Sequence, residues 1–222
     1  MLLPWLFRPQ CAACGVPCED PLCPACSVSL LELGDACPRC AQPKTGASPC
    51  GRCVRDPLPL ERIVCAWRFG GALASAIRRL KFTGATHIAR TVAPLWAPLL
   101  AAAAAETDGV IVPVPLHWRR RLRRGFDQAW LLARHACALA DIAPPVSLLR
   151  RARHAPAQST LAAAARAGNV AGAFALRGDV AGRAVILIDD VVTTGATMAA
   201  AARVLRGGGA STVLGIALAR AE

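Results

Sequence analysis

Val185-Ile-Leu-Ile-Asp-Asp-Val-Val-Thr-Thr-Gly-Ala-Thr197 is the stretch from which the fold can be worked out. Its four branched apolar residues predict a buried strand. Two acids follow at the carboxyl end of that strand, and a hydroxyl-rich turn then opens a helix. Because a helix N-terminus presents unpaired N–H groups and a partial positive charge, the turn suits a phosphate group.

Each residue of this stretch has a chemical reason to be there. Glycine in the turn lets the backbone approach a phosphate closely, and the threonines add hydroxyl donors. Carboxylates at the strand end accept hydrogen bonds from the two hydroxyls of a ribose. Alternatively, two acids after a strand hold a metal or cap a helix. The candidate ribose ligands are Asp189 and Asp190, and the candidate phosphate ligands are Thr193, Thr194, Gly195, Ala196 and Thr197.

Short apolar runs alternate with helical patterns from Arg62 onward. This order predicts an α/β fold with a mostly parallel sheet and helices on both of its faces. Ligands in such sheets bind beyond the carboxyl ends of the strands. The expected strands are 63–69, 110–114, 146–149, 184–188 and 212–219, and the expected helices are 72–80, 86–104, 127–139 and 197–205.

Nine of the eleven cysteines precede residue 54, and eight of these form four C-x-x-C pairs. Two such pairs complete a tetrahedral Cys₄ site, which predicts two structural zinc ions. Disulfides are the alternative, but they would be reduced in a cytosolic protein. The expected ligands are Cys11, Cys14, Cys23, Cys26, Cys37, Cys40, Cys50 and Cys53.

The way in which the four pairs combine stays open between a sequential and an interleaved arrangement. The sequential one is favoured because each site then has its own short loops, with Cys18 as a spare thiol. The Pro-rich stretch 56–60 resembles a stiff linker. We therefore expect a double zinc ribbon over 1–57 and a second domain over 58–222. Basic residues are sparse in the ribbon, so docking is at least as good an interpretation of its role as nucleic-acid binding.

The chain is basic, with 26 Lys+Arg against 14 Asp+Glu and a formal charge of +12. Two zinc ions held by eight thiolates lower this charge to about +8. Such a balance favours nucleic acid or phosphorylated small molecules as partners. We expect a cytoplasmic protein without membrane insertion, because the longest apolar run is interrupted by prolines and is shorter than a bilayer requires.

Four features in order resemble the competence protein F (ComF) family of type I phosphoribosyltransferase-like proteins. They are the C-x-x-C pairs, Leu80-Lys-Phe82, Val112-Pro-Val-Pro115 with Arg124-Gly-Phe-Asp-Gln128, and the stretch quoted above. The resemblance covers nearly the whole chain, although the family usually has Asn where this chain has Asp127. It implies binding of 5-phosphoribosyl 1-pyrophosphate (PRPP) with Mg²⁺. It also implies a part in natural transformation, the uptake and use of external DNA in the cytoplasm.

Five arginines fill six positions after the strand at 110–114. In type I phosphoribosyltransferases the loop at this place holds pyrophosphate, so the resemblance assigns that contact to Arg119, Arg123 and Arg124. Lys81 either reaches the phosphates or complements a helix dipole. The surplus arginines either follow a nucleic-acid backbone or form a solvated basic face.

A second basic stretch, 150–160, lacks apolar periodicity and is interpreted as a loop. It resembles the flexible catalytic loop of the larger family, which closes over PRPP and excludes water. Gln158 and Arg166 are its candidate functional residues.

Two functions of different classes remain. One is a phosphoribosyltransferase in which an unidentified acceptor displaces pyrophosphate from PRPP. The other is a non-catalytic or weakly catalytic module that handles single-stranded DNA, together with other DNA-uptake proteins. The scarcity of aromatic residues, with no Tyr and a total of ten Phe and Trp, counts against base stacking.

Overall fold

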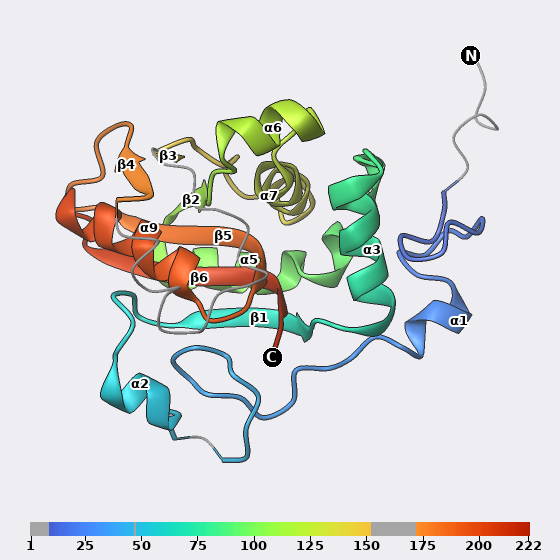
Figure 1. Ribbon diagram of the computed structural model, residues 1–222, viewed down its shortest axis with the longest axis horizontal. Coiled ribbons are helices and arrows are strands. Elements are labelled where there is room, and N and C mark those ends of the chain that lie inside the picture. The colour runs from blue at the N-terminus through green and yellow to red at the C-terminus, as the bar shows by residue number, and fades with distance from the viewer. Residues whose placement is uncertain (1–8, 47, 152–171) are drawn as a thin grey trace.

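The computed structural model describes residues 9–46, 48–151 and 172–222, and its centre is a parallel sheet (Figure 1). The strand order is β1-β6-β5-β2, and every neighbouring pair is parallel. This confirms the predicted fold class. The strands are β1 (Ile63–Arg68), β2 (Val110–Pro113), β5 (Ala184–Val192) and β6 (Thr212–Arg220).

Helices cover both faces of this sheet, so its central strands are buried on both sides and are almost entirely apolar. One core joins Ile186 and Ile188 of β5 to helices on one face. The other core joins Val185 and Leu187 of the same strand to α9 on the opposite face. The helices are α3 (Gly71–Phe82), α4 (His87–Thr91), α5 (Ala97–Thr107), α7 (Gln128–Leu139) and α9 (Ala196–Gly207).

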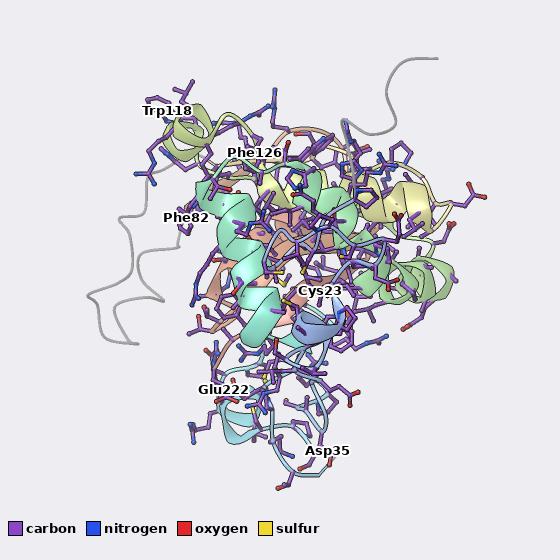
Figure 2. The ribbon with its side chains drawn as sticks, turned by 90° about the vertical axis from the view of Figure 1, so that its right-hand side faces the viewer. Cys23, Asp35, Phe82, Trp118, Phe126 and Glu222 are labelled. Carbon is purple, nitrogen blue, oxygen red and sulfur yellow. The ribbon has the colours of Figure 1, made fainter. Side chains whose placement is uncertain are left out.

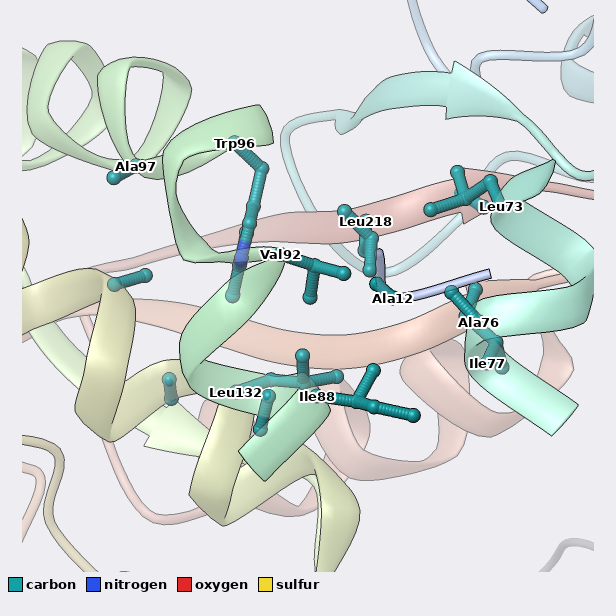
Figure 3. Close-up of a cluster of buried hydrophobic side chains, with 14 of the residues drawn as sticks. Ala12, Leu73, Ala76, Ile77, Ile88, Val92, Trp96, Ala97, Leu132 and Leu218 are labelled. Atoms are coloured by element: carbon teal, nitrogen blue, oxygen red, sulfur yellow. The ribbon is translucent and has the colours of Figure 1, made fainter. Parts of the chain in front are cut away.

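The single helix expected over 86–104 is wrong. α4 ends at Thr91, a short 3₁₀ helix spans Ala93–Leu95, and α5 begins at Ala97. Proline has no N–H to donate and clashes with the preceding turn, so Pro94 and Pro98 divide the segment. The break places Trp96 in the core, where it is 1% exposed and lies near Val92 (Figure 3).

The strand expected over 146–149 does not join the central sheet. β3 (Leu149–Arg151) instead pairs antiparallel with β4 (Phe174–Leu176) in a small separate sheet. Only the N–H of Val146 reaches β2, where it donates to the Ile111 carbonyl at 2.8 Å. Pro144 and Pro145 come directly before Val146 and have no N–H groups with which to extend that pairing.

The cysteine-rich segment packs against the sheet domain in two places. Its first half, with α1 (Pro24–Ser27), contacts α3, where Arg79 donates to the carbonyls of Cys11 and Ala12 at 3.0 and 2.9 Å. Its second half, with α2 (Gly51–Arg55), contacts β1. Cysteines of each half belong to the core on that side.

The boundary near residue 58 stays a prediction, but the stretch 56–60 is more than a spacer. Leu58 and Leu60 are 8% and 2% exposed and pack in the same core as α9. Burial of both leucines therefore fixes how the second half of the cysteine segment sits on β1. Among the described residues, none of the helices combines the length and the apolar character needed to cross a bilayer.

Candidate functional site

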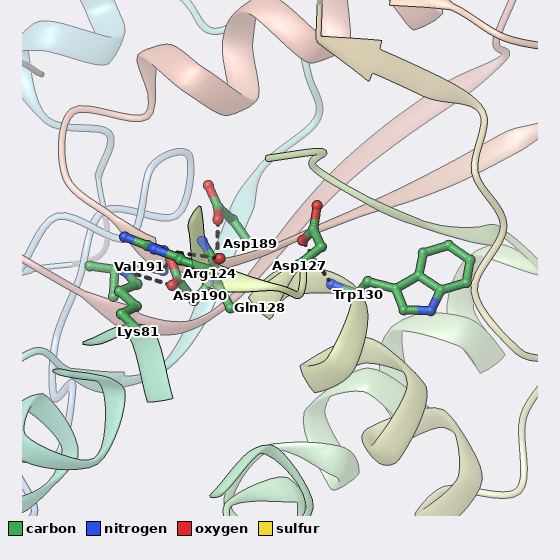
Figure 4. A network of polar contacts seen from close by, with 8 residues as sticks. All are labelled: Lys81, Arg124, Asp127, Gln128, Trp130, Asp189, Asp190 and Val191. Atoms are coloured by element: carbon green, nitrogen blue, oxygen red, sulfur yellow. Dashed lines mark hydrogen bonds and ion pairs between the residues drawn. The ribbon is translucent and has the colours of Figure 1, made fainter. Parts of the chain in front are cut away.

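The candidate site lies at the carboxyl end of β5, where α3, α7 and the loop 193–197 meet it (Figure 4). We call residues 193–197 the phosphate loop, after the ligand that the sequence predicts for them. β5 runs to Val192, further than the expected end at residue 188. Asp189 and Asp190 are therefore within the strand. Their carboxyl groups are close enough to interact with each other.

Asp190 forms an ion pair with Lys81 at the end of α3, with Nζ and Oδ2 2.6 Å apart. Its other oxygen accepts the N–H of Val191 at 2.7 Å. The structure thus brings together two residues that the sequence placed more than a hundred positions apart. Lys81 is a predicted pyrophosphate contact, and in the structure its ammonium group pairs with the carboxylate of Asp190 in the same site.

Burial and the neighbouring charge of Asp190 raise the pKa of Asp189 to about 8. Its Oδ1 accepts the N–H of Asp190 at 2.8 Å, which opposes the shift. The acidic pair therefore holds a proton near neutral pH more readily than an exposed carboxylate would.

The phosphate loop connects β5 to α9, and Gly195 is its turning residue. Gly195 has φ +75°, a left-handed conformation that side chains disfavour, and its carbonyl accepts the N–H of Ala199 at 2.8 Å. A Cβ at this position would lie 3.2 Å from Ile63 Cδ1. Thr193 is exposed, and Thr194 and Thr197 are partly exposed. Their hydroxyls and the first N–H groups of α9 suit an anion.

The arginine-rich stretch is a helix and not the expected loop: α6 spans Trp118–Arg124. Arginine and leucine favour helix, and no glycine or proline interrupts the stretch. Arg124 donates to Gln128 Oε1 at 3.1 Å, and its guanidinium lies 5.3 Å from the ring centre of Phe82. The end of α6 therefore meets the end of α3, beside Lys81.

Four further residues predicted for the site have no described contact with it. Arg123 is exposed on α6. Arg119 belongs to the same helix, but its side chain lies outside the described part of the structure. Gln158 and Arg166 also lie outside the described residues.

Asp127 contributes to the site in a way the sequence analysis missed. It caps α7, where Oδ1 accepts the N–H of Trp130 at 3.3 Å, and its Oδ2 accepts the N–H of Leu116 at 2.7 Å. Burial raises its pKa, although these N–H groups oppose the shift. Asp before a helical pattern is a known capping signal. Its hydrogen bond with the N–H of Leu116 connects two loop positions, and no sequence pattern predicts this bond.

The eight paired cysteines form two groups of four, Cys11, Cys14, Cys23 and Cys26 (the first cluster) and Cys37, Cys40, Cys50 and Cys53 (the second cluster). This is the sequential arrangement. Within each group the sulfurs all lie within 4.8 Å of one another. Cys14 and Cys23 are 3.7 Å apart, and Cys40 and Cys50 are 3.6 Å apart. A tetrahedral zinc site with Zn–S bonds of about 2.3 Å places its sulfurs about 3.8 Å apart, so both groups fit zinc.

Backbone N–H groups favour a thiolate in each cluster. Burial opposes ionisation of Cys11, but the N–H groups of Cys14 and Cys23 outweigh it and lower the pKa to about 6. Cys37 behaves likewise, with the Cys50 N–H 3.2 Å from its sulfur and a pKa of about 6. Cys18 is in neither cluster and donates to the Asp20 carbonyl at 3.1 Å.

Comparison with known proteins gives consistent matches. A family model described as a phosphoribosyl transferase domain matches residues 122–221. The DNA utilization protein YhgH of Salmonella typhimurium is 35% identical over 86% of this chain and 87% of that protein. Competence protein F of Haemophilus influenzae is 31% identical over 91% of this chain and 92% of that protein.

More distant matches complete the comparison. Competence protein ComFC of Bacillus subtilis is 28% identical over 91% of this chain and 85% of that protein. A solved phosphoribosylpyrophosphate synthetase from Mycobacterium smegmatis is 24% identical with a TM-score of 0.36, over 59% of this chain and 33% of that one. By its identity to curated relatives along most of their length, and by the domain it shares with them, the chain belongs to the competence protein F (ComF) family.

Proposed function

We propose that the chain binds PRPP together with Mg²⁺ at the carboxyl end of β5. The observation that carries this proposal is that a turn suited to an anion lies next to two carboxylates, with Lys81 paired to one of them and Arg124 close by. A phosphate, a diol and a pyrophosphate are the three recognition elements of PRPP, and each has a matching group here.

The proposed contacts follow the chemistry of each residue. The phosphate loop, Thr193 to Thr197, receives the 5′-phosphate on its N–H groups and hydroxyls. Asp189 and Asp190 accept hydrogen bonds from the ribose hydroxyls, which favours their ionised forms. Arg119, Arg123, Arg124 and Lys81 surround the pyrophosphate, where Arg124 offers a bidentate fork. Mg²⁺ would neutralise pyrophosphate charge as the leaving group departs.

A transfer reaction is compatible with this site. An acceptor nucleophile would form a bond to C1 of the ribose as the bond from C1 to the pyrophosphate oxygen breaks, and the pyrophosphate leaves with the electron pair. The arginines would stabilise its developing charge. The two cysteine clusters would hold zinc in closed, structural sites, because all four ligand positions of each are filled by the chain.

For the biological role we propose the use of DNA taken up from outside, in the cytoplasm. YhgH and competence protein F are named for DNA utilization and competence. One surface of the chain suits single-stranded DNA. Phe82, Trp118 and Leu122 are 69%, 55% and 74% exposed, and Phe82 and Trp118 lie on the same side of the molecule (Figure 2). Aromatic residues are few in the chain, but these two rings are exposed beside arginines, as in stacking platforms for unpaired bases.

Isothermal titration calorimetry with Mg-PRPP tests the proposed ligand. Wild type should bind, and the Asp189→Asn/Asp190→Asn variant should bind at least about tenfold more weakly, a change of about 1.4 kcal/mol. An Asp179→Asn variant, altered in the exposed turn that leads into the amino end of β5, is the matched control. Absence of binding heat from folded wild type, or equal binding by the double variant, would overturn the proposal. Pyrophosphate release in the presence of candidate acceptors separates turnover from binding alone.

A further inference from the structure

Arg220 is a buried arginine at the end of β6, 2% exposed, and it lies between the second cysteine cluster and the phosphate loop. Its Nε donates to the Cys40 carbonyl at 3.2 Å, and Nη2 donates to the side-chain oxygen of Gln42. Its Nη1 donates to the carbonyl of Val192 at 3.0 Å and to that of Thr193. One guanidinium therefore joins the second cluster to the residues that enter the phosphate loop.

Arg220 carries a positive charge in a buried position. Among residues 9–46, 48–151 and 172–222, no carboxylate forms an ion pair with it. An unpaired buried cation is costly. Four thiolates around a divalent metal would carry a net charge of about −2. The second cluster, whose Cys40 carbonyl contacts Arg220, would thus supply the missing counter-charge.

A second set of contacts connects the same two regions without Arg220. The carbonyl of Arg39, within the Cys37–Cys40 turn, accepts the N–H of Ile63 at 2.9 Å, and the Arg39 side chain donates to the Leu60 carbonyl at 3.2 Å. Ile63 is the residue that packs against Gly195, the turning residue of the phosphate loop. The second cluster is therefore connected to the phosphate loop by two routes, through Arg220 to Val192 and Thr193 and through Ile63 to Gly195.

We propose that Arg220 is a positioning residue through which the second cysteine cluster, when it holds its metal, sets the shape of the phosphate loop. Arg220 makes no contact with the ligand in this scheme. It fixes the carbonyls of Val192 and Thr193 so that the N–H groups and hydroxyls of residues 193–197 face the phosphate. The consequence for PRPP affinity rests on the proposed function, whereas the effect on loop structure does not.

The first cluster offers a matched comparison. Arg79 donates to the carbonyls of Cys11 and Ala12 much as Arg220 donates to that of Cys40, but it lies on α3 and has no described hydrogen bond to the phosphate loop. Loss of Arg79 or of the first cluster should therefore leave the structure of the phosphate loop unchanged.

Hydrogen–deuterium exchange of the full-length, zinc-loaded protein tests the inference without any ligand. In Arg220→Met, peptides covering residues 192–198 should exchange at least about tenfold faster than in wild type, and Arg220→Lys should be intermediate because it keeps the charge but not the fork. Cys53→Ala should speed the same peptides, whereas Arg79→Met and Cys26→Ala should not. Should Arg220→Met fail to fold, Gln42→Ala removes one acceptor of Arg220 at a partly exposed position and should show a smaller increase.

Calorimetry with Mg-PRPP then measures the functional consequence. Arg220→Met should weaken binding about 10- to 100-fold, as is usual for residues that orient binding groups. Unchanged exchange at residues 192–198 in folded Arg220→Met or Gln42→Ala would overturn the inference, as would equal acceleration by Cys26→Ala. If wild type binds no PRPP but the loop still loosens in these variants, the proposed function fails and the positioning role stands.

Discussion

Lys81 Nζ lies 2.6 Å from Asp190 Oδ2, which joins the last turn of α3 to the carboxyl end of β5. The two side chains are 20% and 5% exposed, so most of the pair is shielded from water. Asp189 precedes Asp190 in the strand, and the charge of Asp190 helps to raise the pKa of Asp189. Lys81 therefore has both a structural role, through its pair with Asp190, and a position suited to phosphates.

Lys81→Met should destabilise the fold in a pH-dependent way. Removing one partner of a buried ion pair costs about 3–5 kcal/mol, and the partial exposure of Lys81 reduces the expected loss to about 2–4 kcal/mol at pH 8. At pH 5 the acidic pair can hold a proton, so the loss should be smaller. Urea denaturation at both pH values measures this. Arg62→Met, which removes the exposed pair with Glu106, should cost at most about 1 kcal/mol, and a loss no larger for Lys81→Met would contradict the prediction.

Asp189→Asn should flatten the dependence of stability on pH. Because the pKa of Asp189 rises to about 8 in the folded state, the folded protein keeps a proton that the unfolded chain has already released above pH 4. Wild type therefore loses stability as pH rises from about 4 to about 8, by at most about 1.4 kcal/mol per pH unit from this group. The amide of Asp189→Asn does not titrate, so its free energy of unfolding should not fall in this way. The difference in stability between the variant and wild type should therefore shift in favour of the variant as pH rises from about 4 to about 8. Parallel stability curves in urea denaturation at pH 5, 6, 7 and 8 would disprove it.

Much of this architecture was predictable because its signals are local. The branched apolar run of β5, the turn after it and the four C-x-x-C pairs each show their structure within a few residues. Pro94 and Pro98 are equally local signals, and the missing N–H groups of these prolines explain why the segment expected as one helix is divided.

The contacts that complete the site were not predictable, because they join distant positions. Lys81 with Asp190 and Arg220 with Cys40 span 109 and 180 residues. No periodicity or spacing encodes such pairs. The helix α6 is a different case, because the charge of an arginine run does not distinguish a helix from a loop, whereas its helix propensity favours the helix.

Zinc analysis of the purified protein should find two ions per chain. Cys14→Ser should retain about one, since it removes a ligand from the first cluster alone, and Cys18→Ser should retain two because Cys18 belongs to neither cluster. Chelation should also lower the melting temperature, because buried residues of both cores pack against these cysteines. A full zinc content in Cys14→Ser would contradict the assignment of the clusters.

Arg124→Ala should weaken Mg-PRPP binding about 10- to 100-fold, the loss expected from about 1.5–3 kcal/mol for hydrogen bonds to a charged group. Arg124→Lys should recover part of the affinity, since it restores the charge without the planar fork. Arg183→Ala is the control of equal charge change, because Arg183 is exposed and precedes β5 at its opposite end. Calorimetry at two salt concentrations measures all three, and equal losses for Arg124→Ala and Arg183→Ala would indicate a general charge effect.

Asp127→Ala should cost more than the loss of an ordinary helix cap. An Asp to Ala change at an N-cap costs about 1 kcal/mol, and here it also leaves the N–H of Leu116 without its acceptor, which adds about 1–3 kcal/mol. The stability of Asp127→Asn should lie between those of wild type and Asp127→Ala. The single carbonyl oxygen of Asn can accept only one of the two N–H groups, those of Leu116 and Trp130. In thermal denaturation the melting temperature should therefore be highest for wild type, lower for Asp127→Asn and lowest for Asp127→Ala. An Asn variant as stable as wild type would show that the Leu116 bond adds nothing, and that Asp127 acts only as the cap of α7.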